Sequence, residues 1–388
     1  MQEQFRFGGE IFLYPREQRP IHYLRKERKT MKKMITMLLI LTLCIFLCAC
    51  GVAPAQSPAA AETVTFTDDC GRTVELPAEI TRIAPSGAAA NMFLAAAAPE
   101  YMVSISDALT EAQKPYLDAA LSELPITGSL YGGKGDANLE AILAAAPQVI
   151  IDMGDQRGDT AEVLTALQAQ TGIPCVFIAA DLPNMADAFR TLGTLLAGKA
   201  ERCGVLADFV DETVSLAVET AAKIPESERV SVMYTTGTDG LGTNSRGSSQ
   251  AQVIELVGAV NAIETAEVIQ KSGGNIINME QLYLFAPDVI IFTQGSIYDT
   301  VASETAWQKL AAVSGGRYYE VPNAPYNWLS VPPSMNMLLG IRWLGNLLYP
   351  DYYDLDMVAE TQRAFRTLWG YDMSAAEAEA LLSRSTLK

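Results

Sequence analysis

The chain has 388 residues, with 28 Lys and Arg, 45 Asp and Glu and a single histidine, His22. This length predicts two or three domains, and a hydrophobic content of 49% excludes a disordered chain. Residues 1–49 hold nine basic and four acidic residues, so the chain from Cys50 onward has a net charge of −22. Because so acidic a surface repels phosphate backbones, we expect no nucleic-acid partner.

The amino-terminal segment has the pattern of a targeting sequence. Lys32 and Lys33 precede an uncharged apolar run of 16 residues, 34–49, which ends in small residues. A transmembrane helix needs roughly 20 apolar residues. A basic start, an apolar middle and a small-residue end predict a secretory signal, with a plain membrane anchor as the alternative. Met31 begins a normal signal of this kind, so we interpret residues 1–30 as an upstream extension.

The end of this run, residues 47–51 (LCACG), resembles the lipobox of bacterial lipoproteins. In that motif the cysteine is acylated and becomes the new amino terminus. We therefore predict that residues 1–49 are the upstream extension and the lipoprotein signal peptide, and that Cys50 is lipidated. Residues 50–62 are rich in Ala and Pro and are predicted to be the lipidated tether, which places the protein outside the cell membrane.

Removal of the signal also removes His22, so the mature chain has no histidine. This excludes Ser-His-Asp and Cys-His catalysis and metal sites that use histidine. Cys70, Cys175 and Cys203 are far apart and odd in number, which predicts free, buried thiols and no disulfide framework. We expect no metal site, no cofactor and no enzymatic activity.

Three regions follow the tether. Residues 63–183 begin with a predicted hairpin and continue with strands that alternate with helical patterns, as in an α/β lobe. Residues 184–224 repeat apolar side chains at three-, four- and seven-residue steps without an internal proline, which predicts one long helix. Residues 225–388 repeat the α/β pattern and end in closing helices. The predicted fold is α/β, with two similar lobes, a single long rigid helix between them and a ligand cleft.

An internal repeat supports the two similar lobes. Residues 138–142 (NLEAI) and 146–151 (APQVII) recur 140 residues later as 278–282 (NMEQL) and 286–291 (APDVII). In each copy Asn is predicted to cap a short helix, Glu lies in its first turn, and Pro follows its end. A buried Val-Ile-Ile strand comes next. Each lobe therefore presents one carboxylate at the same position.

Four segments together resemble the substrate-binding proteins of ATP-binding-cassette (ABC) importers, in the branch that carries ferric siderophores, haem and cobalamin. They are residues 68–77 (DDCGRTVELP), the two repeat copies, and the pair 307–313 (WQKLAAV) and 316–322 (GRYYEVP). The resemblance extends over about residues 62–370. It implies a monomer that binds a small molecule between its lobes and delivers it to an ABC permease with its ATPase.

The resemblance also implies that Glu140 and Glu280 dock onto arginines of the permease. The alternative is that each glutamate only complements the positive end of its helix dipole, a contribution of about 0.3–1 kcal/mol. That alternative accounts for each residue separately but not for the same choice at the same position in both copies.

In two-lobed α/β binding proteins the ligand lies at the carboxyl ends of the strands. Loops predicted there carry hydroxyl, amide, aromatic and cationic groups that suit an anion or a planar chelate. The candidate ligand-binding residues are Ser86, Ser129, Tyr131, Tyr234, Asn244, Arg246, Gln294, Tyr326 and Trp328. As alternatives, Arg246 forms a surface ion pair, Tyr131 packs in its loop, and Trp328 belongs to the core.

The missing histidine disfavours a bare zinc or manganese ion, whereas a chelated metal brings its own coordination shell. An iron–siderophore complex is therefore the first expectation, followed by cobalamin, haem and an oxyanion such as molybdate. Two other classes stay open: an enzyme that uses Asp152, Asp155 or Asp239 as paired carboxylates, and a lipid-anchored sensor of the same fold.

Overall fold

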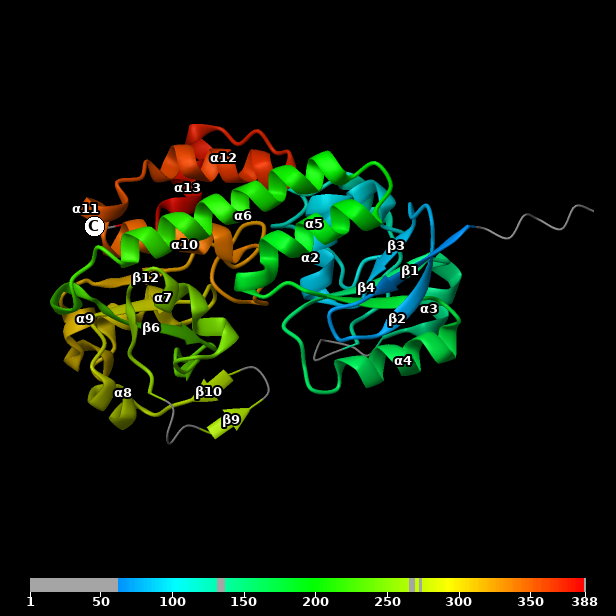
Figure 1. The fold of residues 1–388 in the computed structure, drawn as a ribbon. Coiled ribbons are helices and arrows are strands. Elements are labelled where there is room, and N and C mark those ends of the chain that lie inside the picture. The colour runs from blue at the N-terminus through cyan, green and yellow to red at the C-terminus, as the bar shows by residue number, and fades with distance from the viewer. Residues whose placement is uncertain (1–61, 131–136, 265–268, 272–273, 387–388) are drawn as a thin grey trace, which may run out of the picture. The chain divides into compact units, whose positions relative to one another are not determined.

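The computed structural model describes residues 62–130, 137–264, 269–271 and 274–386. Residues 61–388 form one compact unit, distinct from residues 1–60 (Figure 1). The predicted signal, Cys50, nearly all of the tether, and Tyr131 lie outside the described residues. None of the described helices combines the length and the apolar character that crossing a membrane requires.

The first lobe is built on a parallel sheet with the strand order β3-β4-β5. An antiparallel hairpin, β1-β2, precedes this sheet, and the Asp68 carboxylate joins the two by accepting hydrogen bonds from the N–H groups of Arg72 (2.8 Å) and Phe177 (3.3 Å). The strands are β1 (Thr63–Thr67), β2 (Thr73–Pro77), β3 (Ile83–Pro85), β4 (Val149–Gly154) and β5 (Cys175–Ala179). The helices are α2 (Ala88–Ala97), α3 (Leu139–Ala145) and α4 (Thr160–Thr171).

The helix predicted over residues 184–224 is two antiparallel helices, α5 (Met185–Leu195) and α6 (Ala200–Ala221). The chain reverses between them, with Gly198 at φ 67° in the left-handed region. Gly193 of α5 lies so close to α6 that a Cβ there would be 3.0 Å from the Cβ of Cys203. The apolar repeat continues through the turn because both helices bury their stripes in the same core, so periodicity does not reveal the break.

Helix α6 alone provides the long connection. Its 22 residues span about 33 Å at 1.5 Å per residue. It contacts α2 of the first lobe and, at its other end, α7 and α10 of the second lobe (Figure 1). The fold is therefore two-lobed as predicted, with a shorter spanning helix.

The second lobe is built around β6 (Ser231–Thr236), in a sheet with the order β12-β11-β6-β7-β10-β9 and β8 paired to β6. Strands β8, β11 and β12 run parallel to their neighbours, and β7, β9 and β10 run antiparallel. The other strands are β7 (Gly242–Thr243), β8 (Val260–Asn261), β9 (Ile269–Lys271), β10 (Gly274–Ile276), β11 (Val289–Phe292) and β12 (Tyr318–Glu320). The helices are α7 (Gln252–Leu256), α8 (Met279–Phe285) and α9 (Ala311–Ser314), then α10 (Met337–Leu348), α11 (Pro350–Tyr353), α12 (Met357–Trp369) and α13 (Ala375–Leu382).

The internal repeat forms the same local structure twice. Asn138 caps α3 by accepting a hydrogen bond from the N–H of Ala141 (3.1 Å), and Asn278 caps α8 through the N–H of Gln281 (2.9 Å). Both helices have seven residues and are followed by buried strands, β4 and β11. The predicted caps, short helices and buried strands are confirmed.

Candidate ligand-binding site

In the first lobe, polar residues gather where the strands end. Ser86 follows β3, and its hydroxyl donates a hydrogen bond to the carboxylate of Asp152 in β4. The carbonyl of Ser86 accepts a hydrogen bond from Leu130 (2.8 Å), which brings the adjacent Ser129 close to Gly87. Ser86 and Ser129 are 4% and 6% exposed. The structure thus brings these two predicted residues together at the carboxyl edge of the sheet.

In the second lobe, Gln294 lies at the corresponding edge, just beyond the carboxyl end of β11, and Tyr234 lies within β6. The Tyr234 hydroxyl donates to Oδ1 of Asn327 (3.3 Å), and burial raises the pKa of Tyr234. Asn244 is not at this edge: it follows β7, which runs antiparallel to β6, and its carbonyl accepts a hydrogen bond from the side chain of Asn261 (3.0 Å) beside the amino half of β6. Gln294 is exposed just beyond β11 and accepts a hydrogen bond from the side chain of Asn323. This edge is therefore lined with hydroxyl and amide groups.

Asn327, in the loop after β12, contacts Tyr234 but is not among the predicted site residues. Besides the Tyr234 hydroxyl, its Oδ1 accepts the N–H groups of Leu329 (2.9 Å) and Ser330 (3.1 Å). Asn327 therefore fixes the loop after β12 against β6. Its position next to the predicted site residue Tyr326 could have indicated Asn327 in the sequence. The sequence did not indicate which strand Asn327 would contact.

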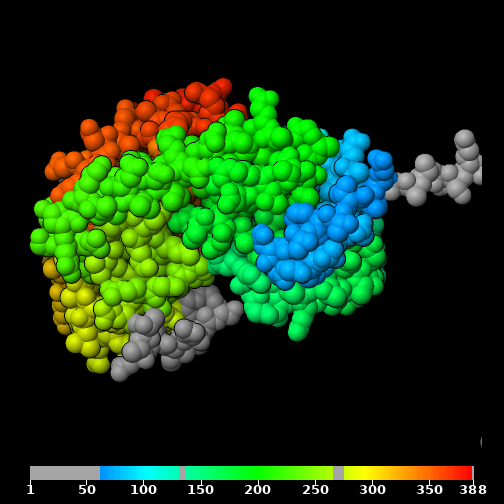
Figure 2. Space-filling model, in the orientation of Figure 1, coloured from blue at the N-terminus to red at the C-terminus, as the bar shows by residue number. Residues whose placement is uncertain are grey.

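The two edges approach each other where the loop before α10 meets the start of α2. The hydroxyl of Ser334, in the second lobe, donates to the carbonyl of Ala89, in the first lobe (3.4 Å). The space-filling view shows the segment of α5 and α6 lying across the upper side of both lobes (Figure 2). The polar groups of both edges therefore belong to facing parts of one compact unit.

Trp328 lies in the core, which was the alternative to a ligand-binding role. Its side chain is fully buried, its Nε1 donates to the carbonyl of Ala324 (3.0 Å), and its own carbonyl lies against Gly340 of α10, where a Cβ would be only 2.1 Å away. A residue enclosed in this way has no free ring face for a ligand, so Trp328 is a core residue. The sequence could not show this, because the burial results from packing against a helix that follows in the chain.

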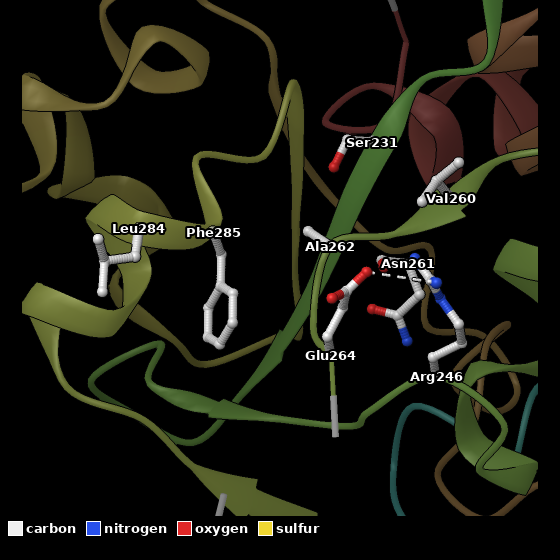
Figure 3. Close-up of a pocket in the computed structure, with 8 residues that line it drawn as sticks. All are labelled: Ser231, Arg246, Val260, Asn261, Ala262, Glu264, Leu284 and Phe285. Atoms are coloured by element: carbon white, nitrogen blue, oxygen red, sulfur yellow. Dashed lines mark hydrogen bonds and ion pairs between the residues drawn. The ribbon is translucent and has the colours of Figure 1, made fainter. Parts of the chain in front are cut away.

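Arg246 also takes its alternative position, in a surface ion pair. Its guanidinium lies 3.4 Å from the Glu264 carboxylate and donates to the carbonyl of Asn261 (3.3 Å), and its side chain is 47% exposed. These residues line a hollow of about 270 Å³ together with Ser231, the first residue of β6 (Figure 3). The hollow is thus at the amino end of that strand, away from the edge where the ligand is expected, and we do not assign Arg246 to the ligand.

Tyr326 is buried, with 9% exposure, and its ring centroid lies 6.4 Å from that of Trp369. Its hydroxyl finds no hydrogen-bond partner among the described residues, and burial raises its pKa. Thr235 and Asn336, neither of them predicted as site residues, also hold buried oxygens, Oγ1 and Oδ1, without a partner in the described part of the chain. These atoms are further candidates for polar contacts from the second lobe.

The residues predicted to dock lie on the outside of the molecule. Glu140 and Glu280 are each the second residue of a short helix, α3 and α8, and both are exposed. Neither forms an ion pair with a described residue. Both carboxylates are therefore available to a partner.

The described residues hold no group of three or more His, Cys, Asp or Glu placed to bind a metal ion. Cys70, Cys175 and Cys203 are free thiols. Burial raises the pKa of Cys175 to about 12. Such a thiol is protonated near neutral pH and is therefore a poor nucleophile there.

Comparison with known proteins identifies the family. The family model for periplasmic binding proteins matches residues 86–325. A vitamin B12-binding protein of Pectobacterium carotovorum is 28% identical over 249 residues, which cover 63% of this chain and 81% of that protein. The structure of an ABC transporter solute binding protein from Sulfurospirillum deleyianum is 29% identical and superposes with a TM-score of 0.76, covering 82% of this chain and 99% of that one.

A more distant structure shares the fold alone. The molybdate periplasmic binding protein of Haemophilus influenzae, bound to molybdate, is 18% identical with a TM-score of 0.64, covering 80% of this chain and 99% of that one. All these relatives are named as binding proteins and not as enzymes. The match to the family model covers more than half of the chain, and the two-lobed fold agrees with it. The chain therefore belongs to the periplasmic binding protein family and is an extracytoplasmic substrate-binding protein of an ABC transporter.

Proposed function

We propose that this protein is anchored to the outside of the cell membrane by lipid on Cys50, binds an iron–siderophore-type metal chelate between its lobes, and delivers it to the permease. The observation that carries the proposal is the chemistry of the two strand edges. Ser86 and Ser129 on one side, and Tyr234 and Gln294 on the other, offer hydroxyl and amide groups. Such groups hydrogen-bond to the periphery of a ligand and do not replace its metal ligands.

The chelate is favoured over a bare metal ion by the ligand chemistry of the chain. Soft divalent ions are held in proteins by imidazole and thiolate groups. The chain after Cys50 has no histidine, and its described residues hold no group of three or more Cys, Asp or Glu placed to bind a metal ion. A siderophore supplies the iron ligands itself, so the protein needs only shape, stacking and hydrogen bonds.

A thermal-shift screen of residues 62–388 against ferric siderophores tests this proposal. A ligand at about 100 times its dissociation constant adds about 2.7 kcal/mol of stability. For a chain of this size that corresponds to a rise of several degrees in Tm. We expect at least one ferric siderophore to produce it and the iron-free compound to produce less. No rise with any ferric chelate would reject the proposed ligand class.

Cobalamin is the second candidate, because the vitamin B12-binding relative matches over 249 residues. Cyanocobalamin, haem and molybdate therefore form the other arms of the same screen. A rise with cyanocobalamin alone would assign the protein to cobalamin uptake. No rise in any arm would favour a lipid-anchored sensor.

We further propose that Glu140 and Glu280 position the loaded protein on the permease. Exposed carboxylates at matching places on the two lobes can meet two basic sites on a partner, which sets orientation and association rate more than affinity for the ligand. Helix α6 links the lobes, so that a small closure around the ligand can change the spacing of the two carboxylates.

A further inference from the structure

Exposed apolar side chains gather around the same two short helices. Leu143 of α3 is 48% exposed and Leu284 of α8 is 84% exposed. Ile276 (52% exposed) ends β10 just before the cap of α8, and Ile126 (50% exposed) precedes Thr127, whose carbonyl accepts the N–H of the α3 cap. These four are half of the eight large hydrophobic side chains that are exposed among the described residues. Such clustering marks a contact surface, since single exposed hydrophobics are ordinarily scattered.

Helical spacing places each leucine beside a glutamate. Leu143 follows Glu140 by three residues, and Leu284 follows Glu280 by four. Residues three or four apart lie on the same side of a helix. Each helix therefore presents a carboxylate next to an apolar side chain, the combination found where an interface has an apolar centre and a charged rim.

The second lobe adds a recess to this combination. Leu284 and Phe285 form one side of the hollow of about 270 Å³, with Arg246 and Glu264 across from them (Figure 3). An exposed leucine next to a partly apolar recess can both insert into a partner and receive a side chain from it. Side chains that fill well-packed pockets from which water is excluded contribute most of the binding energy at interfaces.

We propose that Leu143 and Leu284 are apolar contacts for the permease, and that Leu284 with its recess makes the stronger of the two. This inference rests on the docking function proposed above for Glu140 and Glu280. The permease is the occupant because the leucines are continuous with the two carboxylates on the same helices. A body with a net charge of −22 from Cys50 onward also favours a basic partner surface. The apolar contacts make part of the docking affinity independent of salt.

The test measures binding of the full-length lipoprotein to its permease–ATPase complex in lipid nanodiscs, at low salt and at about 0.5 M salt, where charges are strongly screened. We expect Leu284→Gln to weaken binding about tenfold and Leu143→Gln about threefold, equally at both salt concentrations. Val218→Gln is the matched control, because Val218 is 52% exposed on α6, away from both helices. It should bind as the wild type does, and Tm should be unchanged in every variant.

The glutamate variants separate failure of this inference from failure of the docking proposal. If Glu140→Arg with Glu280→Arg weakens binding but both leucine variants bind like the wild type, the apolar contact is rejected and docking through the glutamates stands. If the leucine effects disappear at high salt, the apolar contact is also rejected. If neither class of variant changes binding, both proposals fail.

Discussion

Replacing Arg202 with alanine should destabilise the protein strongly, because one guanidinium joins three helices. Arg202 lies in the first turn of α6. Its Nε and Nη2 donate to the carbonyl of Ala96 at the end of α2 (3.0 and 2.9 Å). Its Nη1 donates to the carbonyl of Thr367 (2.7 Å) and its Nη2 to that of Leu368 (2.9 Å), both at the end of α12. Carbonyl groups at helix ends lack partners within the helix and carry the negative end of its dipole.

The magnitude follows from what the substitution removes. Hydrogen bonds that involve a charged group contribute about 1.5–3 kcal/mol each, and a buried carbonyl left without a donor costs about 1–3 kcal/mol. Three carbonyls lose their donor. Against this, burial lowers the pKa of Arg202, which shows that the charge itself is held at some cost. The net loss in the free energy of unfolding should be about 3–4 kcal/mol for Arg202→Ala. Arg202→Lys should reduce the free energy of unfolding somewhat less, because an ammonium can still donate to some of these carbonyls. It cannot reach all three, so a loss remains.

Urea unfolding of residues 62–388 at neutral pH measures this difference by linear extrapolation. Arg366→Ala is the control, since Arg366 is 66% exposed and, among the described residues, forms an ion pair with Asp372 alone (2.6 Å). An exposed pair contributes about 0–1 kcal/mol. If Arg202→Ala costs no more than Arg366→Ala, the three-helix contact does not stabilise the protein and the reasoning is refuted.

Three further predictions concern acid stability, helix ends and docking. The side-chain hydrogen bond from Arg363, assisted by Arg342, lowers the pKa of Glu212 from 4.5 to about 2; its stabilisation is therefore present above pH 4.5 and lost as the pH falls toward 2. At neutral pH the free energy of unfolding of the wild type should exceed that of Glu212→Gln by only about 1 kcal/mol, because solvent screens this half-exposed group. Equal stability of the two proteins at pH 7 would contradict this. Ala146 and Ala286 end α3 and α8 at φ 48° and 43°, so replacing either by glycine should raise the free energy of unfolding by about 0.5–1 kcal/mol. A lower free energy of unfolding in a urea titration of either variant would contradict this. Glu140→Arg with Glu280→Arg should abolish cellular uptake and leave the Kd for the ligand unchanged; normal uptake would reject docking through these residues.

Local structure could be predicted where neighbouring residues determine it. Asn138 and Asn278 cap helices because an asparagine side chain can accept a hydrogen bond from an N–H three residues ahead, and that geometry depends only on the local chain. The exposure of Glu140 and Glu280 follows from the same short helices. For this reason the repeat was a sound basis for predicting two similar lobes.

The errors arose where distant parts of the chain decide the outcome. The turn at Gly198 interrupts the predicted helix, but the apolar residues on both sides face one core and keep a helical spacing. Trp328 is enclosed by α10, which no local pattern around it indicates. Arg246 pairs with Glu264 because strand β8 passes beside it, a contact set by sheet topology. Burial and ion pairing of this kind can be predicted only when the three-dimensional fold is known.

We propose that the chelate binds between the lobes and not in the hollow beside Arg246. Isothermal titration of residues 62–388 with the ferric siderophore that raises Tm most tests this directly, using Gln294→Trp at the proposed edge and Arg246→Ala in the hollow. We predict saturable one-to-one binding that Gln294→Trp weakens and Arg246→Ala leaves unchanged. Binding that is lost in Arg246→Ala and retained in Gln294→Trp would place the ligand in the hollow and rule out binding between the lobes.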